Sequence, residues 1–407
     1  MKTEDMVLAE SQLKFARVRV CFLSSMHPPL DKRVFEKEAV SLAERGYEVI
    51  LIAPDRTEKS WVERGCKIVT YKKGGGSLRY RAMRLWLLFK KALRIKADVY
   101  HANEVDSWIL AVLLKIFRFG RSKVIFDVHE HYVSIIARRF PSFIRPFVEK
   151  LVKLLFRMLT PLTDHLIFAK STIVCDYSVN GKYTVVYNFS FSKVAESLAA
   201  SLETNHRNKR EGEFVAIYTG LINKMRCWPE ILEAASLAKE RIKDLRLVFI
   251  GEFNDGTEEE FRRKIDELGL EGCVNYMKWM PLNELYIHLL TADVGLVTLR
   301  SGEMNHIYAM PHKMFDYMAA GLPVIIPNFS VEIVPMLEDC KCGVAVKTDD
   351  SQKLAEALIY FYENPDERRR MGERGRKAVI KSFNWEGERE KLFRVYEELI
   401  EKPLVRG

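Results

Sequence analysis

The sequence contains no apolar run long enough to cross a membrane, and residues 1–17 carry charges throughout without an apolar core. We therefore expect neither a transmembrane helix nor a signal peptide, and interpret residues 1–17 as a flexible tail. The seven cysteines are odd in number and scattered, which argues against a disulfide framework and suits reduced thiols in a cytoplasmic protein. Cys340 and Cys342 stand alone, with no second pair nearby to complete a zinc site.

Acidic metal-binding motifs and nucleic-acid motifs are also missing. No Asp-x-Asp pair follows a predicted nucleotide-binding strand, and Asp349 and Asp350 lie late in the chain, ahead of a helix, as capping residues do. We therefore expect no divalent metal and no other cofactor. The 64 basic and 55 acidic residues give a net charge of +9, a modest excess that favours anionic ligands or membrane surfaces. Nucleic acid is not an expected partner.

What the chain does contain is a repeated alternation of buried strands and amphipathic helices. Near the start, VRVCFLSS from Val18 and YEVILIAP from Tyr47 flank a helix over 32–45, a pattern typical of a parallel sheet with helical crossovers. A chain of 407 residues is too long for one typical core, so two doubly wound, Rossmann-like α/β domains are predicted. Their predicted limits are 18–190 and 213–382, with a polar linker over 191–212 between them and a crossover helix and tail over 383–407.

One polar stretch, Tyr308 to Asn328, lies between two signals for buried structure, where doubly wound sheets bind ligands. Pro311 fits the first position of a helix and Gly321 its end, and the apolar run that follows predicts a buried strand. Lys313 and Asp316 share one polar flank of this helix. The helix start could hold an anion, or Lys313 and Asp316 could form an ordinary surface ion pair, and the residues alone leave both open.

This stretch resembles the acid, seven residues, acid motif of the retaining glycosyltransferases of family 4, which have the GT-B fold of two Rossmann-like domains facing across a cleft. The resemblance covers Val18 to Lys402. Asp316 stands at the second acidic position, where the resemblance implies that it accepts hydrogen bonds from the ribose hydroxyls of a nucleotide. Tyr308 stands in place of the first acid, and the wording PHKMFDYMAAGLPV is similar to a subgroup of polysaccharide enzymes.

A second stretch, YTGLINKMRCWPEILEAA from Tyr218, resembles the family's glycine, arginine and lysine segment, which binds the diphosphate of the sugar donor. Arg226 stands at the lysine position, Leu221 replaces the arginine, and Lys224 is the nearest residue able to supply a second positive charge. Cations there stabilise the charge that gathers on a departing diphosphate. The alternative is an exposed basic loop ahead of a helix. The expected diphosphate contacts are Gly220, Lys224, Arg226, Met310, Pro311 and His312, and the expected nucleoside contacts are Gly251, Met280 and Asp316.

In the first domain, VIFDVHEHY resembles the segment that carries the family's catalytic histidine, and His129 is the match. Arg226 and Asp316 complete the expected catalytic set. A histidine that ends a parallel strand lies where active sites gather, although a lone histidine is as often structural. The residues expected on the acceptor side of the cleft are His27, Asp31, Arg33, Glu104 and Glu130. Glu104 and nearby Asp106 could instead cap the next helix, and we expect Asp106 to be a capping residue.

These residues predict an enzyme that moves a sugar, of hexosyl or N-acetylhexosaminyl type, from a nucleotide-diphosphate sugar to an acceptor hydroxyl with retention at the anomeric carbon. The expected acceptor is a lipid-linked or polysaccharide glycan intermediate. One alternative is a nucleotide-sugar epimerase of the same fold, which needs carboxylates for acid and base work. The other is a catalytically silent, nucleotide-sugar-binding subunit, which Tyr308 and Leu221 would suit.

Two basic amphipathic stretches, 78–96 and 143–159, mix apolar residues with Lys and Arg at helical spacing. Such a helix either packs one face on the core and leaves the other in water, or lies on an anionic lipid surface. We therefore expect a cytoplasmic protein that can contact the inner face of the cell membrane, with Lys150, Lys153 and Arg157 on the contacting surface.

Overall fold

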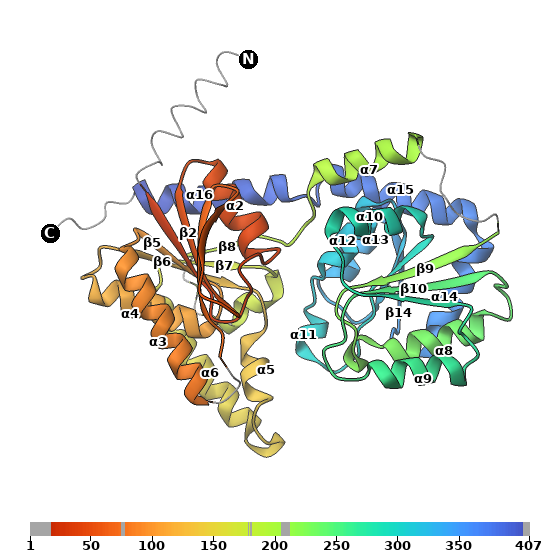
Figure 1. The fold of residues 1–407 in the computed structure, drawn as a ribbon, viewed down its shortest axis with the longest axis horizontal. Coiled ribbons are helices and arrows are strands. Elements are labelled where there is room, and N and C mark those ends of the chain that lie inside the picture. Colours follow the sequence, from red (N-terminus) through yellow and green to blue (C-terminus); the bar gives the residue numbers. More distant parts are fainter. Residues whose placement is uncertain (1–17, 75–77, 178, 180, 205–211, 402–407) are drawn as a thin grey trace, which may run out of the picture. The chain divides into compact units, whose positions relative to one another are not determined.

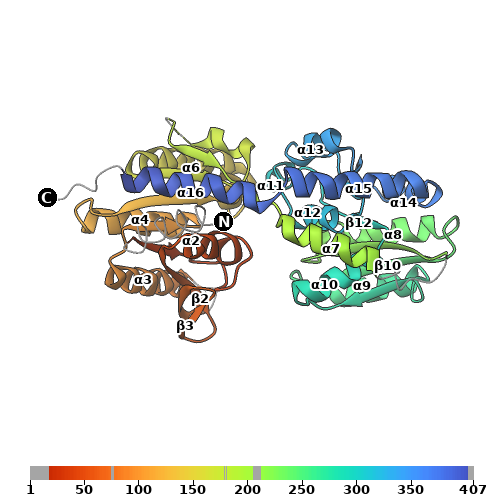
Figure 2. The ribbon, with the colours of Figure 1, turned by 90° about the horizontal axis from the view of Figure 1, so that it is seen from above.

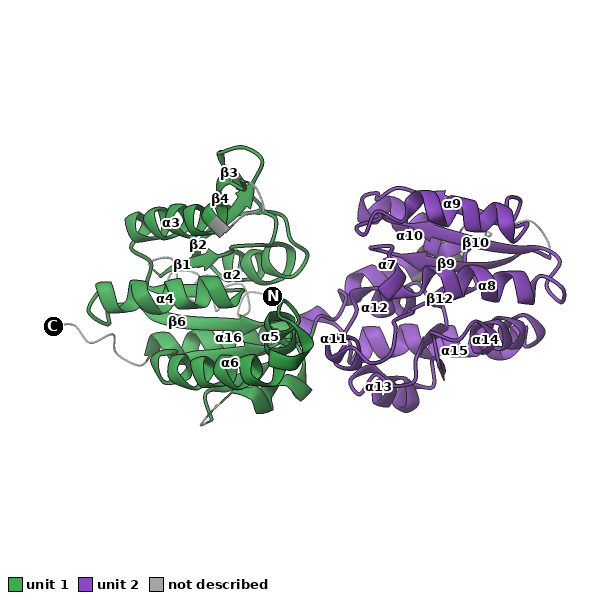
Figure 3. Ribbon diagram, turned by 90° about the horizontal axis from the view of Figure 1, so that it is seen from below, with its two compact units in different colours: residues 1–187, 388–407 green, residues 188–387 purple. Residues whose placement is uncertain are grey.

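The computed structural model describes residues 18–74, 78–177, 179, 181–204 and 212–401, and the chain divides into two compact units. Unit 1 comprises residues 1–187 and 388–407, and unit 2 comprises residues 188–387 (Figure 3). Each unit has its own sheet with helices packed on it (Figure 1). The predicted α/β class with two Rossmann-like domains is therefore confirmed.

The sheet of unit 1 has eight strands in the order β3-β4-β2-β1-β5-β6-β7-β8. Neighbouring strands run parallel, except that β3 pairs antiparallel with β4 at one edge. This edge strand was not predicted, because its sequence SWVE carries no apolar run. The strands are β1 (Arg19–Leu23), β2 (Glu48–Asp55), β3 (Ser60–Glu63), β4 (Cys66–Lys72), β5 (Val99–Ala102), β6 (Lys123–Val128), β7 (His165–Phe168) and β8 (Tyr183–Val185).

The helices of unit 1 lie on both faces of this sheet (Figure 1). The first crossover contains a π-helical turn, η1 (Val34–Ala39), ahead of α2 (Val40–Glu44), where the sequence predicted one regular helix. The backbone N–H of Glu38 donates to the carbonyl of Arg33 at 3.0 Å, and both side chains are buried. The other helices are α3 (Leu78–Ile95), α4 (Val105–Phe117), α5 (Tyr132–Ala137), η2 (Ser142–Ile144), α6 (Arg145–Leu159), η3 (Thr160–Leu162) and η4 (Ser171–Asp176).

The last helix, α16 (Trp385–Glu401), carries the chain back from unit 2 to unit 1, as the sequence predicted (Figure 2). Within unit 1 it lies beside α2, where Arg45 Nη2 donates to Glu397 Oε1 at 2.9 Å. The Tyr396 side chain is fully buried, and its hydroxyl forms a hydrogen bond with Nδ1 of His101 at 2.7 Å. Helix α16 is thus part of the core of unit 1.

The sheet of unit 2 has six parallel strands in the order β11-β10-β9-β12-β13-β14. The strands are β9 (Phe214–Thr219), β10 (Leu245–Ile250), β11 (Val274–Met277), β12 (Val294–Leu296), β13 (Val324–Pro327) and β14 (Gly343–Val346). Further elements are η5 (Lys224–Arg226), α8 (Trp228–Ala238), α9 (Glu258–Glu267), α10 (Leu282–Thr291), α11 (Met304–Ile307), α12 (His312–Ala319), α13 (Ile333–Cys340), α14 (Ser351–Glu363) and α15 (Pro365–Lys381). Trp228, Phe249 and Phe261 are part of its apolar core.

The segment predicted as a polar linker, 191–212, begins with a helix of unit 2 instead. Helix α7 (Ser192–Thr204) packs on α12 and α15 and buries Ala195 and Leu198, whose spacing of three residues places them on one helical face. The rest of the predicted linker, apart from residue 212, lies outside the described residues, as does the predicted tail over 1–17. Residues 192–204 are therefore a packed helix of unit 2 and not a linker.

We expect Tyr396→Phe to lower the free energy of unfolding of unit 1 by about 1–3 kcal/mol, because a buried ring nitrogen of His101 would lose its partner. Urea unfolding followed by circular dichroism and by tryptophan fluorescence measures the change. Tyr360→Phe is the control, since Tyr360 is 38% exposed in unit 2 and its hydroxyl is expected to contribute less than about 0.5 kcal/mol. Equal stability of the Tyr396→Phe variant and the parent would contradict this role of α16.

Candidate donor site and catalytic histidine

The carboxyl ends of two neighbouring strands of unit 2 meet at a pair of glycines. Gly220 follows β9 and Gly251 follows β10, with φ angles of 103° and 155°. A Cβ atom on Gly251 would lie 1.8 Å from the carbonyl oxygen of Gly220, so a larger residue would force the strand ends apart. Both glycines, predicted from sequence as ligand contacts, lie at the carboxyl edge of the sheet, where open α/β sheets bind their ligands.

Helix α12 begins beside Gly220, because a Cβ atom on Gly220 would lie 3.6 Å from Cε of Lys313. Pro311 is the residue before the helix and not its first helical residue, with φ −75° and ψ 129°. Asp316 is buried and accepts a hydrogen bond from Ser190 Oγ at 2.6 Å. The surface ion pair considered from the sequence is therefore wrong, since the amine of Lys313 makes no hydrogen bond within the described part of the chain.

The basic loop that follows Gly220 is ordered by the side chain of Asn223. Its Oδ1 atom accepts a hydrogen bond from the backbone N–H of Arg226 at 3.0 Å, which closes the short turn η5. The half-buried Arg226 side chain is close enough to Tyr218 and Lys313 for its charge to act on both. Lys224, predicted as the second diphosphate cation, instead pairs with Glu260 at 2.7 Å on the exposed surface. Arg226 thus belongs to the glycine edge, and Lys224 does not.

The remaining predicted nucleotide contacts of unit 2 lie in segments next to the same strands. Met280 is half-buried in the loop after β11, and Met310 is 5% exposed in the segment that joins α11 to α12. Tyr308, which stands where the family has its first acid, ends α11. The structure therefore assembles Gly220, Gly251, Arg226 and the start of α12 around one edge, with Met280 on the next strand's loop.

In unit 1, His129 lies just beyond β6 and is held by a buried carboxylate two residues earlier. The His129 Nε2 atom lies 2.5 Å from Oδ2 of Asp127. Arg33 donates two hydrogen bonds of 2.8 Å to the carboxylate of Asp127, one from Nε and one from Nη2. Burial alone would raise the pKa of Asp127, but the charges of Arg33 and His129 hold it well below its usual value. Asp127 is therefore an ionised group that fixes the orientation of the His129 ring.

Arg33 was expected on the acceptor side of a cleft, and the structure corrects that expectation. Its side chain is 3% exposed, and Nη1 donates to the carbonyl of Val186 at 2.9 Å. Its Nε atom also lies 3.1 Å from Oε1 of Glu38. Because its guanidinium contacts two carboxylates and a backbone carbonyl inside the core, Arg33 supports Asp127 and cannot bind an acceptor directly.

A second layer of buried polar groups lies behind this pair. Burial and the nearby Asp127 raise the pKa of Glu38, and burial lowers the pKa of His101 to about 3. Glu38, His101 and Asp127 offer ligand atoms within 4.8 Å of one another, as a metal site requires. Arg33, however, already supplies a positive charge to both carboxylates, so the cluster is balanced by a guanidinium.

The loop after β1 places His27 next to His129, with the two ring centroids 5.1 Å apart. His27 Nδ1 lies 3.3 Å from Oδ2 of Asp31, and Nε2 lies 3.8 Å from Oε1 of Glu104. Burial opposes the charged form of His27, but the hydrogen bond with Asp31 and the charges of Glu104 and Asp31 raise its pKa to about 9. The structure thus places His27 and Asp31, predicted as acceptor contacts, beside His129, predicted as catalytic.

Glu104 has a structural role, which was the alternative considered from the sequence. Its carboxylate accepts hydrogen bonds from Ser24 Oγ at 2.8 Å and from the backbone N–H groups of Ser25 and Met26 at 2.9 and 3.0 Å. It also forms a capping box with Ser107 at the start of α4. Glu104 therefore fixes the loop that carries His27 and is no free acceptor contact.

Of two further predicted residues, Asp106 is placed differently from the expectation, and Glu130 stays a predicted acceptor contact. Asp106 does not cap a helix, because it accepts hydrogen bonds from Arg81 Nε at 3.0 Å and Nη2 at 2.7 Å. Glu130 pairs with Lys170 at 3.2 Å, and its side chain stays 47% exposed, next to His129 in sequence.

Sequence reasoning did not single out Asp127, Glu38 or His101 as site residues. The visible sign was Asp127 itself, a charged residue inside the apolar strand VIFDV.

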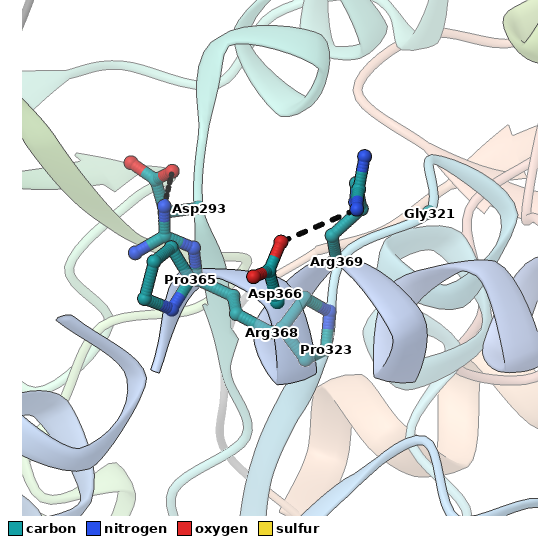
Figure 4. Close-up of a pocket in the computed structure, with 7 residues that line it drawn as sticks. All are labelled: Asp293, Gly321, Pro323, Pro365, Asp366, Arg368 and Arg369. Atoms are coloured by element: carbon teal, nitrogen blue, oxygen red, sulfur yellow. Dashed lines mark hydrogen bonds and ion pairs between the residues drawn. The ribbon is translucent and has the colours of Figure 1, made fainter. Parts of the chain in front are cut away.

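A separate hollow of about 420 Å³ lies at the opposite edge of the unit 2 sheet (Figure 4). It is lined by Asp293 and Pro323, which immediately precede β12 and β13, and by the start of α15. Arg368 pairs with Asp293 at 3.3 Å and Arg369 pairs with Asp366 at 3.2 Å across this hollow. Its charged groups are paired with one another at the amino ends of the strands, so it is not the donor site.

Comparison with known proteins matches two family models to adjacent parts of the chain. The model described as Glycosyltransferase Family 4 matches residues 33–189, and the model described as Glycosyl transferases group 1 matches residues 202–378. EpsD of Bacillus subtilis is 27% identical over 173 residues, 42% of each chain. An MMP alpha-(1->4)-mannosyltransferase of Mycolicibacterium hassiacum is 28% identical over 167 residues, 41% of this chain and 38% of the relative. These matches span less than half the length of either relative.

Solved structures with the same fold cover nearly the whole chain. Anabaena HepE in complex with UDP-glucose superposes with a TM-score of 0.68 at 12% identity, over 94% of this chain and 100% of that one. A sucrose-phosphate synthase from Thermosynechococcus elongatus gives 0.68 at 16% identity, over 95% and 100%. The fold of two α/β units, each with its own sheet of mostly parallel strands, is the GT-B fold. With both family models matched, the chain belongs to the glycosyltransferases of family 4 type.

We expect the stability of unit 1 to fall as the pH rises from about 6.5 to 9. The pKa of His27 is raised in the folded state, so its protonated form stabilises the fold below the ordinary histidine pKa, and this contribution is lost as the pH passes about 9. His27→Gln should flatten the decline by roughly 1–3 kcal/mol. The measurement is urea unfolding at several pH values.

The control for this experiment is His288→Gln, which removes a half-buried histidine from α10 of unit 2. This variant should keep the decline of the parent. A decline that persists undiminished in His27→Gln would show that the charge of His27 does not stabilise unit 1.

Proposed function

We propose that the protein is a retaining glycosyltransferase that transfers a hexosyl or N-acetylhexosaminyl group from a nucleotide-diphosphate sugar to an acceptor hydroxyl. The observation that carries the proposal is the ligand-ready edge of unit 2, where Gly220, Gly251, Arg226 and the start of α12 converge. Anabaena HepE, whose crystal structures hold UDP and UDP-glucose, supports a nucleotide sugar as the donor. A colanic acid biosynthesis glycosyltransferase of Escherichia coli, WcaL, is 30% identical over 128 residues and supports a polysaccharide glycan as the acceptor. A lipid-linked glycan intermediate is the other acceptor that we propose.

The chemistry follows from where charge develops during transfer. As the bond between the anomeric carbon and the diphosphate breaks, negative charge moves to the phosphate oxygens, and a cation placed beforehand stabilises the transition state more than the ground state. Arg226 can bind two phosphate oxygens at once through its planar guanidinium. The first N–H groups of α12, which lack partners within the helix, add positive potential beside Gly220. We therefore propose that no divalent metal takes part.

His129 has the geometry of a residue that contacts the donor sugar. Its Nε2 atom is bound to Asp127, so Nδ1 is the ring atom available to a ligand. The ionised Asp127 favours a proton on Nε2 and fixes the ring plane. His129 would then orient a sugar hydroxyl near the anomeric carbon, while Asp316 would bind the ribose from unit 2.

The two alternatives predict different products. An epimerase would need an acid and a base at the sugar, yet the carboxylates near His129 are engaged, with Asp127 held by Arg33 and Asp31 by His27. A silent binding subunit would hold the nucleotide sugar without consuming it. Donor consumption with release of a nucleoside diphosphate supports transfer, and a changed sugar still attached to its nucleotide would show epimerisation.

We expect the purified protein to release a nucleoside diphosphate from one nucleotide sugar in the presence of a chelator. Arg226→Ala should lower turnover by about 10²–10³-fold and weaken donor binding much less, because the stabilisation grows as charge develops. Turnover is measured by coupled diphosphate detection, and donor affinity by calorimetry. Arg246→Ala is the matched control, since Arg246 pairs with Glu213 away from this edge and should leave both quantities unchanged.

Two outcomes would contradict the metal-free scheme or the role of Arg226. Inhibition by the chelator that magnesium or manganese reverses would establish a metal requirement. Unchanged turnover of the Arg226→Ala variant would remove Arg226 from the site.

A peripheral contact with anionic membrane is the second part of the proposal, and the outer surface of α6 supports it. Val148, Val152 and Phe156 on one face of α6 are buried, whereas the opposite face exposes an apolar stripe. This α6 stripe consists of Phe147, Leu151, Leu154 and Met158 of α6 together with Phe143 of the preceding turn η2, and these side chains are between 53% and 83% exposed. Arg145, Lys150 and Arg157 flank the stripe and are exposed, while Lys153 pairs with Asp176 at 2.8 Å.

This combination of exposed apolar and basic side chains is typical of helices that lie in a membrane interface. In the described part of the chain, no helix is both long and apolar enough to cross a membrane. Lys153 is committed to an internal ion pair, which leaves Lys150 and Arg157 of the predicted basic set for lipid headgroups. We propose that the α6 stripe enters the headgroup region beside these two residues.

We expect the protein to cosediment with vesicles that contain anionic lipid at low salt, and to dissociate as the salt concentration rises. Phe147→Ser combined with Leu151→Ser should weaken binding by about tenfold or more, because two exposed apolar side chains no longer enter the headgroup region. The control is Ile287→Ser in α10, which removes an equally exposed apolar side chain (64%) from unit 2. Equal binding of the double variant and the parent would remove the α6 stripe from the contact.

A further inference from the structure

Lys313, in the first turn of α12, has a buried amine with no protein partner. Its Nζ atom is inaccessible to solvent and makes no hydrogen bond among the residues that the structure describes. It lies 3.5 Å above the centre of the Tyr218 ring, and a Cβ atom on Gly220 would lie 3.7 Å from it. The amine therefore sits against the bare backbone of Gly220, at the carboxyl end of β9.

The neighbouring polar groups are occupied elsewhere and cannot serve the amine. Asp316, one turn further along α12, accepts a hydrogen bond from Ser190. The hydroxyl of Tyr317 accepts a hydrogen bond from the backbone N–H of Thr219 at 2.8 Å. The charged group that acts on Lys313 most directly is Arg226, which has the same sign. Among the described residues, the stabilising contact of the amine is therefore the face of the Tyr218 ring.

A buried cation without a hydrogen-bonding partner is costly, and a lysine side chain is long enough to avoid such a position where water is within reach. Unpaired buried polar groups in native proteins call for an explanation, of which a ligand is one. The position of this amine beside Gly220, Arg226 and the start of α12 makes an anion the fitting ligand. Two cations directed at one spot would repel each other unless a negative group lay between them.

We propose that Lys313 binds the diphosphate of the sugar donor, as the second cation of the site beside Arg226. This assignment rests on the proposed function and adds a residue to it. It also accounts for two departures of the sequence from the family motif. Leu221 stands where the family has its arginine, and Lys224, the substitute expected from the sequence, is tied to Glu260. Lys313 supplies the missing charge from a different element, α12.

Donor binding should then be coupled to protonation. In the free protein, burial and the charge of Arg226 lower the pKa of Lys313 well below the ordinary lysine value, which favours the neutral amine. A bound diphosphate would reverse this preference, so the amine takes up a proton from solvent as the ligand binds. Of the other groups near Lys313, burial raises the pKa of Tyr218 to about 12 and that of Tyr317 higher still, so neither titrates near neutral pH.

Calorimetric titration of the full chain with UDP, GDP and ADP in turn, without divalent metal, tests the proposal. The same titration in Hepes and in Tris, which differ in ionisation enthalpy and contain no phosphate to compete for the site, reports how many protons are taken up. For the diphosphate that binds, we expect uptake of up to one proton at pH 7.5. Lys313→Met keeps the length and the apolar stem of the side chain; it should weaken binding by about 10–100-fold, as expected for a lost charged hydrogen bond, and abolish the uptake.

Three comparisons separate a binding role from other causes. His312→Gln, which removes the neighbouring imidazole, should retain the proton uptake, and its loss there would assign the proton to His312. Lys243→Met, an exposed lysine beyond α8, should match the parent in affinity and uptake. The unliganded Lys313→Met variant should melt at the same temperature as the parent or higher, because the amine has no hydrogen-bonding partner to lose and the methionine side chain can still contact the Tyr218 ring. A lower melting temperature would indicate a structural role.

The failure of this inference differs from a failure of the proposed function. If the parent binds a nucleoside diphosphate and Lys313→Met binds it equally tightly with equal proton uptake, Lys313 is not part of the site, whereas the proposed function stands. If the parent binds none of the three diphosphates and no nucleotide sugar, the proposed function itself is wrong, and Lys313 with it.

Discussion

The ligand-binding edge of unit 1 depends on one buried ion pair, between Arg33 and Asp127. An isolated carboxylate inside β6 would be costly, and the two-pronged contact of the guanidinium compensates it. The same guanidinium reaches the backbone of Val186 after β8 and the side chain of Glu38 in η1. Three segments distant in sequence are therefore joined at one charge. This arrangement also fixes the orientation of the His129 ring, since Nε2 of His129 binds the carboxylate of Asp127.

At the carboxyl edge of the unit 2 sheet the constraint is different, because a ligand proposed to bind there must approach the backbone closely. The contact between Gly251 and the carbonyl of Gly220 leaves no space for a side chain, and it draws the ends of β9 and β10 together. The start of α12 lies against the same backbone through Lys313. Geometry in unit 1 is thus fixed by side-chain charges, and geometry in unit 2 by the absence of side chains.

The sequence predicted the features that depend on local pattern. Alternating apolar strands and amphipathic helices gave both sheets, and a glycine directly after an apolar strand marked Gly220. His129 and Asp316 were found through their motif surroundings. Pairings between distant segments were not predictable, because nothing near Lys224 in sequence indicates Glu260, and nothing near Glu104 indicates the loop at Ser24.

Some of these distant pairings left a visible trace in the sequence without revealing the partner. Asp127 is a charged residue in the middle of the strand VIFDV, where an unpaired carboxylate would not be stable. Arg33 and Glu38 are five residues apart, and the π-helical turn between them cannot be read from a pattern that predicts ordinary helix. The tyrosine of α16 that binds His101 lies nearly three hundred residues further along the chain.

The balance of buried charge distinguishes what each unit can bind. At the edge of unit 1, each cation has an acidic partner within the fold, Arg33 with Asp127 and His27 with Asp31. Because these charges are already balanced, a charged ligand would cost free energy there. This edge therefore suits the uncharged hydroxyls of a sugar. At the edge of unit 2, Arg226 and Lys313 are two neighbouring basic residues, and Nζ of Lys313 has no hydrogen-bonding partner in the part of the chain that the structure describes. An interior with such an excess is completed by an anion, and a diphosphate carries the charge that this edge lacks.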